Sequence, residues 1–263
     1  MKYFKPLVYI FALMLLFQFF AAVYLLIIAG FTGNLEDVTA LSGNAQSFGL
    51  LLTQISMLIF LLLVFKKYGI KHYWRIKKAP RKAYLWAFIA GFAMINISLL
   101  VMDVMNLIIP EALDRYIEVV EASFGDTNLL LGFIVVVIGA SLIEEIMLRG
   151  IYFRFFENIL PVWLLIGLSG LFFGLFHMNI VQGIFGTLIG ILMALAFYWI
   201  RSLWIPILMH MGNNLHAWLG GAVPEAWLEA TPMVVFNYIL MFVVLPISLY
   251  QLYRFKTTPS DGL

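Results

Sequence analysis

Residues 129–157 read LLLGFIVVVIGASLIEEIMLRGIYFRFFE, an apolar run that is interrupted by Glu144, Glu145 and Arg149. A helix of about 20 mostly apolar residues crosses the hydrocarbon core of a bilayer, and this run is long enough to do so. Ionisable side chains are costly inside a membrane, so each one within a span is a candidate for a functional role. The stretch therefore predicts a membrane-spanning helix that carries functional polar groups.

The composition of the whole chain also indicates a membrane protein. Of its 263 residues, 63% are hydrophobic and 11% are charged, against roughly 25% charged in a typical soluble domain. A globule of this length cannot hide so much apolar surface, which excludes a soluble enzyme, and disorder requires the opposite composition. The chain has no cysteine and a net charge of +2, which excludes disulfides and thiol chemistry and indicates no nucleic-acid partner.

Apolar runs of similar length recur along the chain and predict an all-α, polytopic membrane bundle of about eight transmembrane helices, with residues 1–263 in a single domain. These runs are 6–30, 48–65, 83–109, 129–157, 161–178, 181–200, 203–222 and 231–253. The first run is too long for a signal peptide, so we expect it to be retained. The segment 110–124 has apolar residues at helical spacing opposite its acids, which predicts a surface helix.

The charges of the connecting segments predict the orientation. Positive charge gathers in segment 66–82, which contains no acid, whereas 31–47 and 110–128 are acidic. Cytoplasmic loops carry the excess of lysine and arginine, so we expect 66–82 and both termini in the cytoplasm. Basic residues near the two ends agree with this orientation: Lys2, Lys5, Arg254 and Lys256. The chain is therefore expected to be a multi-pass protein of the cell membrane.

The two adjacent glutamates of the span at 129–157 are expected to differ in role. Glu145 and Arg149 are four residues apart and share a helical face, which predicts an ion pair. Glu144 points in another direction, because neighbouring residues lie about 100° apart around a helix. Without a local cation its carboxylate readily takes up a proton in an apolar site, which is the property of a general base near neutral pH.

Polar residues in later spans supply the other candidates. On antiparallel helices that meet near residue 160, Glu144 and His177 lie at nearly equal depth, about 24–26 Å from the turn, whereas His210 and Asn214 share a face at a shallower level. A water held by Glu144 and His177 would attack a carbonyl, and His210 and Asn214 would donate hydrogen bonds to the oxyanion. This arrangement predicts peptide hydrolysis without a covalent intermediate. His216 faces elsewhere and is expected to be structural.

Three motifs in this order resemble the CPBP family of intramembrane proteases, which includes the type II CAAX prenyl endopeptidases and bacteriocin-immunity proteins. They are Glu144-Glu145-xxx-Arg149, Phe173-xxx-His177 and His210-xxx-Asn214, and the stretch SLWIPIL at 202–208 resembles the family's usual lead-in. The resemblance covers about 141–214, and Leu148 departs from the aromatic residue that the family commonly has.

The resemblance implies an endopeptidase that acts on a membrane-associated peptide or protein, CAAX peptides being the eponymous substrates. It implies that Glu144, His177, His210 and Asn214 are catalytic and that Glu145 and Arg149 support them. We place the catalytic core at about 129–222. The sequence does not identify the substrate, and the lipid bilayer is the other expected partner.

The cofactor stays open at this stage. Members of the family are often described as metalloproteases, and Glu144, His177 and His210 could supply a zinc site of two histidines and one glutamate. The sequence has no HExxH motif. A zinc protease would also need a separate base, and Glu145 is committed to Arg149. We therefore favour a metal-free mechanism, with zinc as the alternative.

Two other functions fit parts of the sequence. The stretch Gly167-Leu168-Ser169-Gly170 matches the GxSG of rhomboid serine proteases, with His216 as the candidate base. That interpretation leaves Glu144 and Glu145 without a role. A catalytically inactive membrane scaffold or immunity protein would have the same fold, and the intact motifs argue against it.

Overall fold

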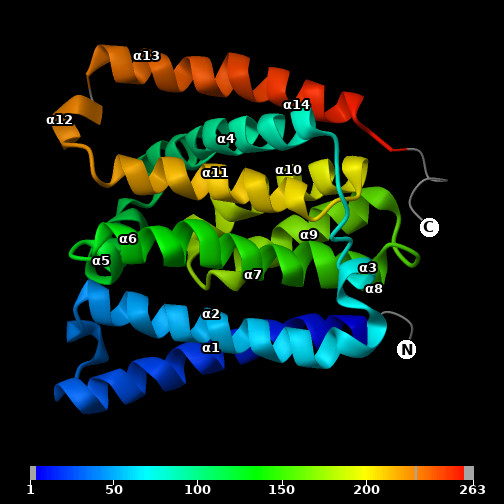
Figure 1. Ribbon diagram of the computed structural model, residues 1–263. Helices are drawn as coiled ribbons and strands as arrows, with labels where there is room; N and C mark the ends of the chain where they lie inside the picture. Colours follow the sequence, from blue (N-terminus) through cyan, green and yellow to red (C-terminus); the bar gives the residue numbers. More distant parts are fainter. Residues whose placement is uncertain (1–3, 229, 258–263) are drawn as a thin grey trace.

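The computed structural model describes residues 4–228 and 230–257, and its regular structure there is helical throughout (Figure 1). Each predicted span contains a helix or a continuous helical segment. In chain order they are α1 (Phe4–Thr32), α2 (Gly43–Phe65), α4 (Arg81–Ile108), the segment Leu129–Phe156, α9 (Val162–Phe176), α10 (Ile180–Ile200), α11 (Trp204–Gly220), and α13 (Thr231–Ile239) with α14 (Leu245–Arg254). The prediction of an all-α membrane bundle is confirmed.

The spans differ in length more than the sequence suggested. Among the described residues, six helical segments are long and apolar enough to cross a membrane, and α9 and α11 are not among them. With 15 residues, α9 is about 22 Å long, less than the roughly 30 Å of a bilayer core. It ends at Phe176, with His177 as its C-cap, because Met178 has a left-handed backbone, with φ of 55°, and Asn179 caps α10. Of the eight expected spans, six are thus long enough to cross a membrane within the described residues, and α9 and α11 are shorter.

The fourth span is irregular around its glutamates. It runs through α6 (Leu129–Gly132), a π-helix (Phe133–Ala140), α7 (Ser141–Glu145), a second π-helix (Ile146–Ile151) and α8 (Tyr152–Phe156). π-Helical turns are rare and often mark functional sites. The two glutamates thus lie on a short α-helical segment between two widened stretches.

Glycines let the central helices approach closely. A Cβ atom on Gly91 of α4 would collide with the carbonyl of Met209 on α11, and one on Gly212 would collide with the carbonyl of Phe88. In the same way, a Cβ atom on Gly174 of α9 would collide with the backbone of α10. Small residues at such crossings are typical of membrane helices, because they bring backbones into van der Waals contact.

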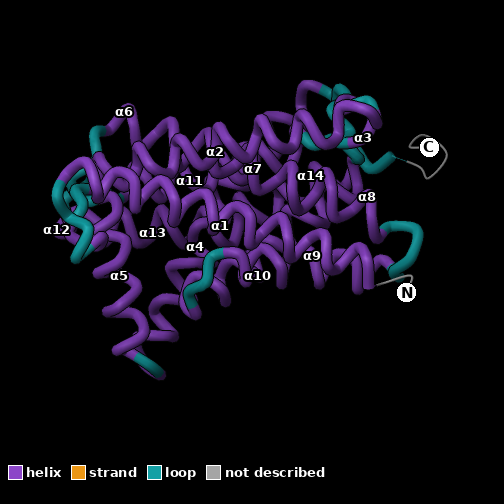
Figure 2. Tube along the Cα trace, turned by 90° about the horizontal axis from the view of Figure 1, so that it is seen from below, coloured by secondary structure: helices purple, strands orange, loops and turns teal. Residues whose placement is uncertain are grey.

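The bundle has two chemically different ends. The beginning of α1, the end of α14, α8 and the short helix α3 (Ile70–Tyr73) lie at one end, and α12 (Glu225–Leu228) lies at the other (Figure 1). The predicted surface helix is present as α5 (Pro110–Phe124), and Figure 2 shows it at the end opposite α3. The start of α1 and the end of α14 therefore lie on the same side of the bundle. Which side faces the cytoplasm stays a prediction, and Lys2 lies outside the described residues.

Candidate active site

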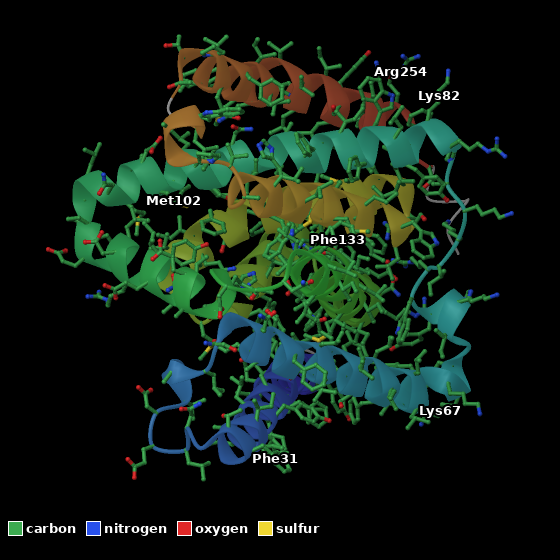
Figure 3. All side chains as sticks on the ribbon, turned by 60° about the vertical axis from the view of Figure 1, so that its left-hand side comes forward. Phe31, Lys67, Lys82, Met102, Phe133 and Arg254 are labelled. Atoms are coloured by element: carbon green, nitrogen blue, oxygen red, sulfur yellow. The ribbon has the colours of Figure 1, made fainter. Side chains whose placement is uncertain are left out.

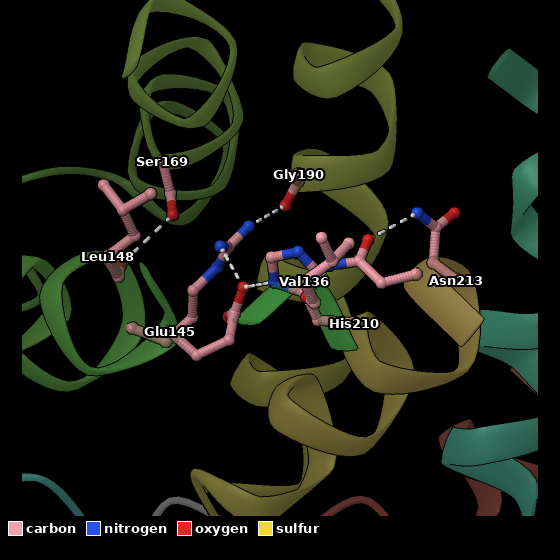
Figure 4. A network of polar contacts seen from close by, with 9 residues as sticks. Val136, Glu145, Leu148, Ser169, Gly190, His210 and Asn213 are labelled. Atoms are coloured by element: carbon pink, nitrogen blue, oxygen red, sulfur yellow. Dashed lines mark hydrogen bonds and ion pairs between the residues drawn. The ribbon is translucent and has the colours of Figure 1, made fainter. Parts of the chain in front are cut away.

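An arginine, a glutamate and a histidine form a buried chain of contacts at the centre of the bundle (Figure 4). Arg149 donates from Nη1 to Oε1 of Glu145 at 2.8 Å, and the same oxygen lies 3.1 Å from Nδ1 of His210. Arg149 also donates from Nη2 to the carbonyl oxygen of Gly190 at 2.6 Å. The predicted Glu145–Arg149 ion pair is thus confirmed. The link to His210 is a contact between distant segments that the sequence did not reveal.

The chain of contacts has a clear electrostatic reason. The side chains of Glu145 and Arg149 are fully buried, and a buried charge is tolerated only when it is paired and hydrogen-bonded. Gly190 lies where α10 comes close to α9, since a Cβ atom there would contact the Cα of Gly170. The carbonyl of Gly190 provides the arginine with a second acceptor. Glu145 and Arg149 together present one fixed carboxylate oxygen to His210.

The position of Glu145 determines how His210 can act. A histidine whose Nδ1 faces a carboxylate carries its proton on that nitrogen and turns Nε2 towards other groups. His210 is 4% exposed, so its Nε2 is available only within the protein interior.

Glu144 lies beside this chain without joining it. Its side chain is buried, and within the described part of the chain its Oε2 atom has no hydrogen-bond partner. It is close enough to His210, Glu145 and Arg149 to interact with each electrostatically. A buried carboxylate oxygen without a partner is unusual, because an unmade hydrogen bond costs free energy. Such an atom is free to bind a water or a substrate.

His177 and His210 come together around one aromatic ring. The ring of Phe173 lies edge to face with both imidazoles, at centroid distances of 5.2 Å to His177 and 5.3 Å to His210. The guanidinium carbon of Arg149 lies 5.1 Å from the centroid of the same ring. His177 is partly exposed at the end of α9 and interacts electrostatically with His210. No hydrogen bond joins Glu144 to His177 within residues 4–228 and 230–257, and His210 is the group that interacts electrostatically with both.

Asn214 contacts the first π-helix. Its Nδ2 donates to the carbonyl oxygen of Val136 at 2.9 Å, and its Oδ1 accepts a bond from Asn213 at 3.2 Å (Figure 4). From α2, Gln54 donates in the same way to the carbonyl of Val135 at 2.9 Å. Inside a membrane, carbonyls freed by a helix irregularity need partners. One N–H group of Asn214 is used in this way, and the second is left for another acceptor.

The depth difference between Glu144 and His210 is smaller than the sequence suggested. The helix that carries Glu144 ends at Phe156 rather than near residue 160, so Glu144 lies at most about 18 Å from that end. The π-helix at Ile146–Ile151 shortens the distance further, because wider turns place more residues in a given length. These irregularities allow a residue deep in α7 to meet one in the first half of α11.

A further contact comes from α1, whose residues carried no motif. Gln18 donates from Nε2 to the carbonyl oxygen of Phe176 at 3.0 Å. The rings of Phe17 and Phe176 are also in contact, with centroids 5.0 Å apart. Phe176 directly precedes His177, so α1 secures the end of the helix that presents this histidine. A single glutamine in the apolar run 6–30 was the only signal for this contact.

Ser169 and His216, the two residues of the rhomboid-like interpretation, have separate hydrogen-bond partners. Ser169 donates to the carbonyl oxygen of Leu148 at 3.3 Å. His216 lies 2.7 Å from the carbonyl oxygen of Phe92 through its Nδ1, and its ring stacks on that phenylalanine at 4.3 Å. Each side chain thus serves its own helix contact. This arrangement does not favour a serine protease, and it agrees with the structural role expected for His216.

The suggested zinc ligands do not form a metal site in this arrangement. In the described part of the chain, no three histidine, aspartate or glutamate side chains are grouped as metal ligands would be. Nδ1 of His210 faces Glu145, and His177 has no hydrogen bond to Glu144. Because Nδ1 of His210 faces Glu145, Nε2 is the ring nitrogen that could bind a metal, and the metal-free mechanism stays a prediction.

The comparison with known families finds one match. Residues 126–216 match the family described as type II CAAX prenyl endopeptidase Rce1-like. The matched segment contains both glutamates, Arg149, both histidines and Asn214. No curated protein and no solved structure matches the chain. Over residues 126–216 the chain is thus similar to the Rce1-like family of type II CAAX prenyl endopeptidases.

Proposed function

We propose that this protein is an intramembrane endopeptidase that uses a water activated by Glu144 and His177. The observation that carries the proposal is the buried carboxylate of Glu144, which has an unpartnered Oε2 and, unlike Glu145, is not held by Arg149 and His210 through its other oxygen. The similarity of residues 126–216 to the Rce1-like family supports a CAAX-type endopeptidase in general. The identity of the residues that act, and the mechanism, are the proposed part.

The first step is the attack of water on a peptide carbonyl. Glu144 accepts a proton from a water molecule that His177 orients, and the water oxygen bonds to the carbonyl carbon. The carbonyl oxygen becomes an oxyanion. His210, in its cationic form, and the second N–H of Asn214 donate hydrogen bonds to it. Glu145 stabilises that cation, and Arg149 holds Glu145 in place.

The second step releases the products. The C–N bond of the tetrahedral intermediate breaks, and Glu144 returns its proton to the departing amine nitrogen. The carbonyl re-forms as a carboxylic acid, so that one water is consumed for each bond cleaved. The scheme requires no metal, and we propose that the reaction proceeds without one.

The test is a cleavage assay with purified protein in lipid vesicles. The probe is a quenched fluorescent peptide with a prenylated CAAX terminus, presented beside unprenylated membrane-inserted peptides. We expect the wild type to cleave a probe with or without a strong zinc chelator. Glu144→Gln should lose nearly all turnover, whereas Glu118→Gln, an exposed acid of α5, should retain it.

The outcomes separate the competing functions. Turnover by folded Glu144→Gln protein would contradict the assignment of the base. Loss of wild-type turnover with the chelator, restored by zinc, would contradict the metal-free mechanism. A folded wild type that cleaves none of the peptides would contradict the proposed endopeptidase and favour a membrane scaffold.

A further inference from the structure

One end of the bundle is surrounded by exposed positive charge. We call this group the basic rim, and it consists of Lys66, Lys67, Lys71, Lys78, Arg81, Lys82, Arg254 and Lys256. They come from the segment between α2 and α4, from the start of α4 and from the end of α14. Figure 3 shows Lys67, Lys82 and Arg254 at this end and Phe31 and Met102 at the other.

The charge of the basic rim is not balanced by neighbouring acids in the described part of the chain. Segment 66–82 contains none. Among residues 4–228 and 230–257, the acid at this end is Glu157, whose side chain is 10% exposed and forms ion pairs with Arg75 and Arg201. Within the described residues, the exposed lysines of the basic rim thus form no ion pair with an acidic side chain. The opposite end carries the exposed acids of α5.

The basic rim lies where the lipid-facing surface ends. On α2, the exposed residues Leu62, Leu63 and Val64 come directly before Phe65 and the first lysines. On α14, the exposed ring of Tyr253 comes directly before Arg254. Tyrosine is typical of the membrane–water interface. The ammonium and guanidinium groups are therefore at the level of lipid headgroups.

The segment that carries most of the basic rim is folded and docked. Trp74 is 1% exposed and packs against Gly150. The N–H of Leu203 donates to the carbonyl of Arg75 at 3.1 Å, and Ser202 donates to the carbonyl of Lys77 at 2.6 Å. Positive charge suffices to orient a membrane protein, and that role needs no docked loop. The docking holds the exposed lysines in fixed positions around the rim.

We propose that the basic rim is a binding surface for anionic lipids, whose phosphate headgroups its exposed lysines and arginines contact. Juxtamembrane clusters of basic residues attract anionic lipids at roughly 1 kcal/mol for each residue near the surface, equivalent to about a fivefold preference. The surface is separate from the glutamate and histidine cluster, so the proposal does not depend on the proposed proteolysis.

The experiment measures lipid selectivity at the protein surface. The full chain is reconstituted in phosphatidylcholine nanodiscs that contain a trace of spin-labelled phosphatidylglycerol or spin-labelled phosphatidylcholine. Electron paramagnetic resonance then gives the fraction of each label that the protein immobilises. We expect about fivefold preference for phosphatidylglycerol in low salt. The ratio of immobilised phosphatidylglycerol to immobilised phosphatidylcholine should fall towards one in 1 M NaCl, where charges are screened within about 3 Å.

Two matched variants locate the effect. Replacing four of the eight rim cations, as Lys66→Gln, Lys67→Gln, Lys71→Gln and Lys78→Gln, should lower the preference clearly below the wild-type value. The control removes four exposed charges at the other end, as Glu111→Gln, Asp114→Asn, Glu118→Gln and Glu121→Gln, and should leave the preference unchanged. Arg81, Lys82 and Arg254 stay in place so that the charge that orients the chain is largely kept.

Several results would overturn the proposal. Equal immobilisation of both labels by the wild type, or equal losses in the two variants, would exclude a lipid surface at the basic rim. Displacement of the labelled lipid by soluble glycerol phosphate would assign the rim to free phosphate groups. Displacement by soluble polyglutamate, with no lipid preference in its absence, would assign it to an acidic polypeptide.

Discussion

Glu145 has two partners that depend on its charge. It balances the fully buried guanidinium of Arg149 and fixes Nδ1 of His210. Removing one member of a buried ion pair leaves the other charge uncompensated, which typically costs about 3–5 kcal/mol. Glu145 is therefore a residue whose loss affects folding before it affects chemistry.

The first prediction concerns this ion pair. Glu145→Gln should lower the free energy of unfolding by about 3–5 kcal/mol, measured by denaturation in mixed micelles. Glu145→Leu combined with Arg149→Leu should be more stable than Glu145→Gln, because no charge is then left alone. If Glu145→Gln were as stable as the wild type, the charge of Glu145 would not be needed for folding.

The second prediction concerns Phe173, which contacts both histidines and Arg149. Phe173→Leu should lower kcat by tenfold or more, because a displacement of about 1 Å in an active site can cost about a hundredfold. Phe172→Leu is the control, since Phe172 is equally buried at 4% and touches neither histidine ring. Similar kcat values for the two variants would show that Phe173 only fills space.

The third prediction separates the two protease chemistries. Ser169→Ala should keep the cleavage activity within about twofold, because the hydroxyl makes one neutral hydrogen bond, to Leu148. Asn214→Ala should lower kcat by on the order of 10²–10³, the usual cost of one oxyanion donor. The reverse order of effects in the vesicle assay would favour a serine nucleophile.

At the scale of elements, helices outside the matched segment position its polar residues. Gln18 on α1 secures the end of α9, and Gln54 on α2 binds a carbonyl of the first π-helix. Hydrogen bonds between membrane helices contribute about 0.6 kcal/mol on average, with a maximum near 1.7. Each bond contributes little to the free energy of folding, so the main effect of these bonds is to favour one arrangement of the helices.

The fourth prediction tests the contact between α1 and α9. Gln18→Leu should lower the free energy of unfolding by about 0.6–1.7 kcal/mol and should increase the rate at which diethyl pyrocarbonate modifies His177, followed by mass spectrometry. Leu15→Ala is the control, because Leu15 is 65% exposed on the same helix and should not change that rate. If the modification rate of His177 were unchanged in Gln18→Leu, the contact with α1 would not be needed to position His177.

At the scale of the whole molecule, the alternating direction of the helices separates a basic end from an acidic end. Positive charge at one end and acids at the other give the chain a preferred orientation. The start of α1 and the end of α14 share the basic end (Figure 1). The cytoplasmic location of this end remains a prediction of the charge distribution.

The fifth prediction tests that orientation, using the absence of native cysteine. Single cysteines at His72 and at Val119, both exposed, should react with a membrane-impermeant maleimide from opposite sides of the membrane in intact cells. The cysteine at position 119 should be labelled from outside, and the one at 72 only after permeabilisation. Labelling of both from the same side would contradict the arrangement of the bundle.

The sequence alone determined the features that depend on neighbours along the chain. The apolar runs predicted the helices, and the spacing of Glu145 and Arg149 predicted their ion pair, because residues four apart in a helix always lie side by side. The short length of α9 was not foreseen, since the run 161–178 looked long enough to span. Its end depends on the backbone of Met178 and the cap at Asn179.

Only the tertiary structure decided which distant groups meet. The contacts of Glu145 with His210 and of Gln18 with Phe176 join residues from different helices. Helical periodicity specifies the direction of a side chain around its own axis, and it contains no information on the partner helix. That choice depends on close packing at glycines such as Gly91 and Gly212 and on the π-helical turns that change the depth of Glu144.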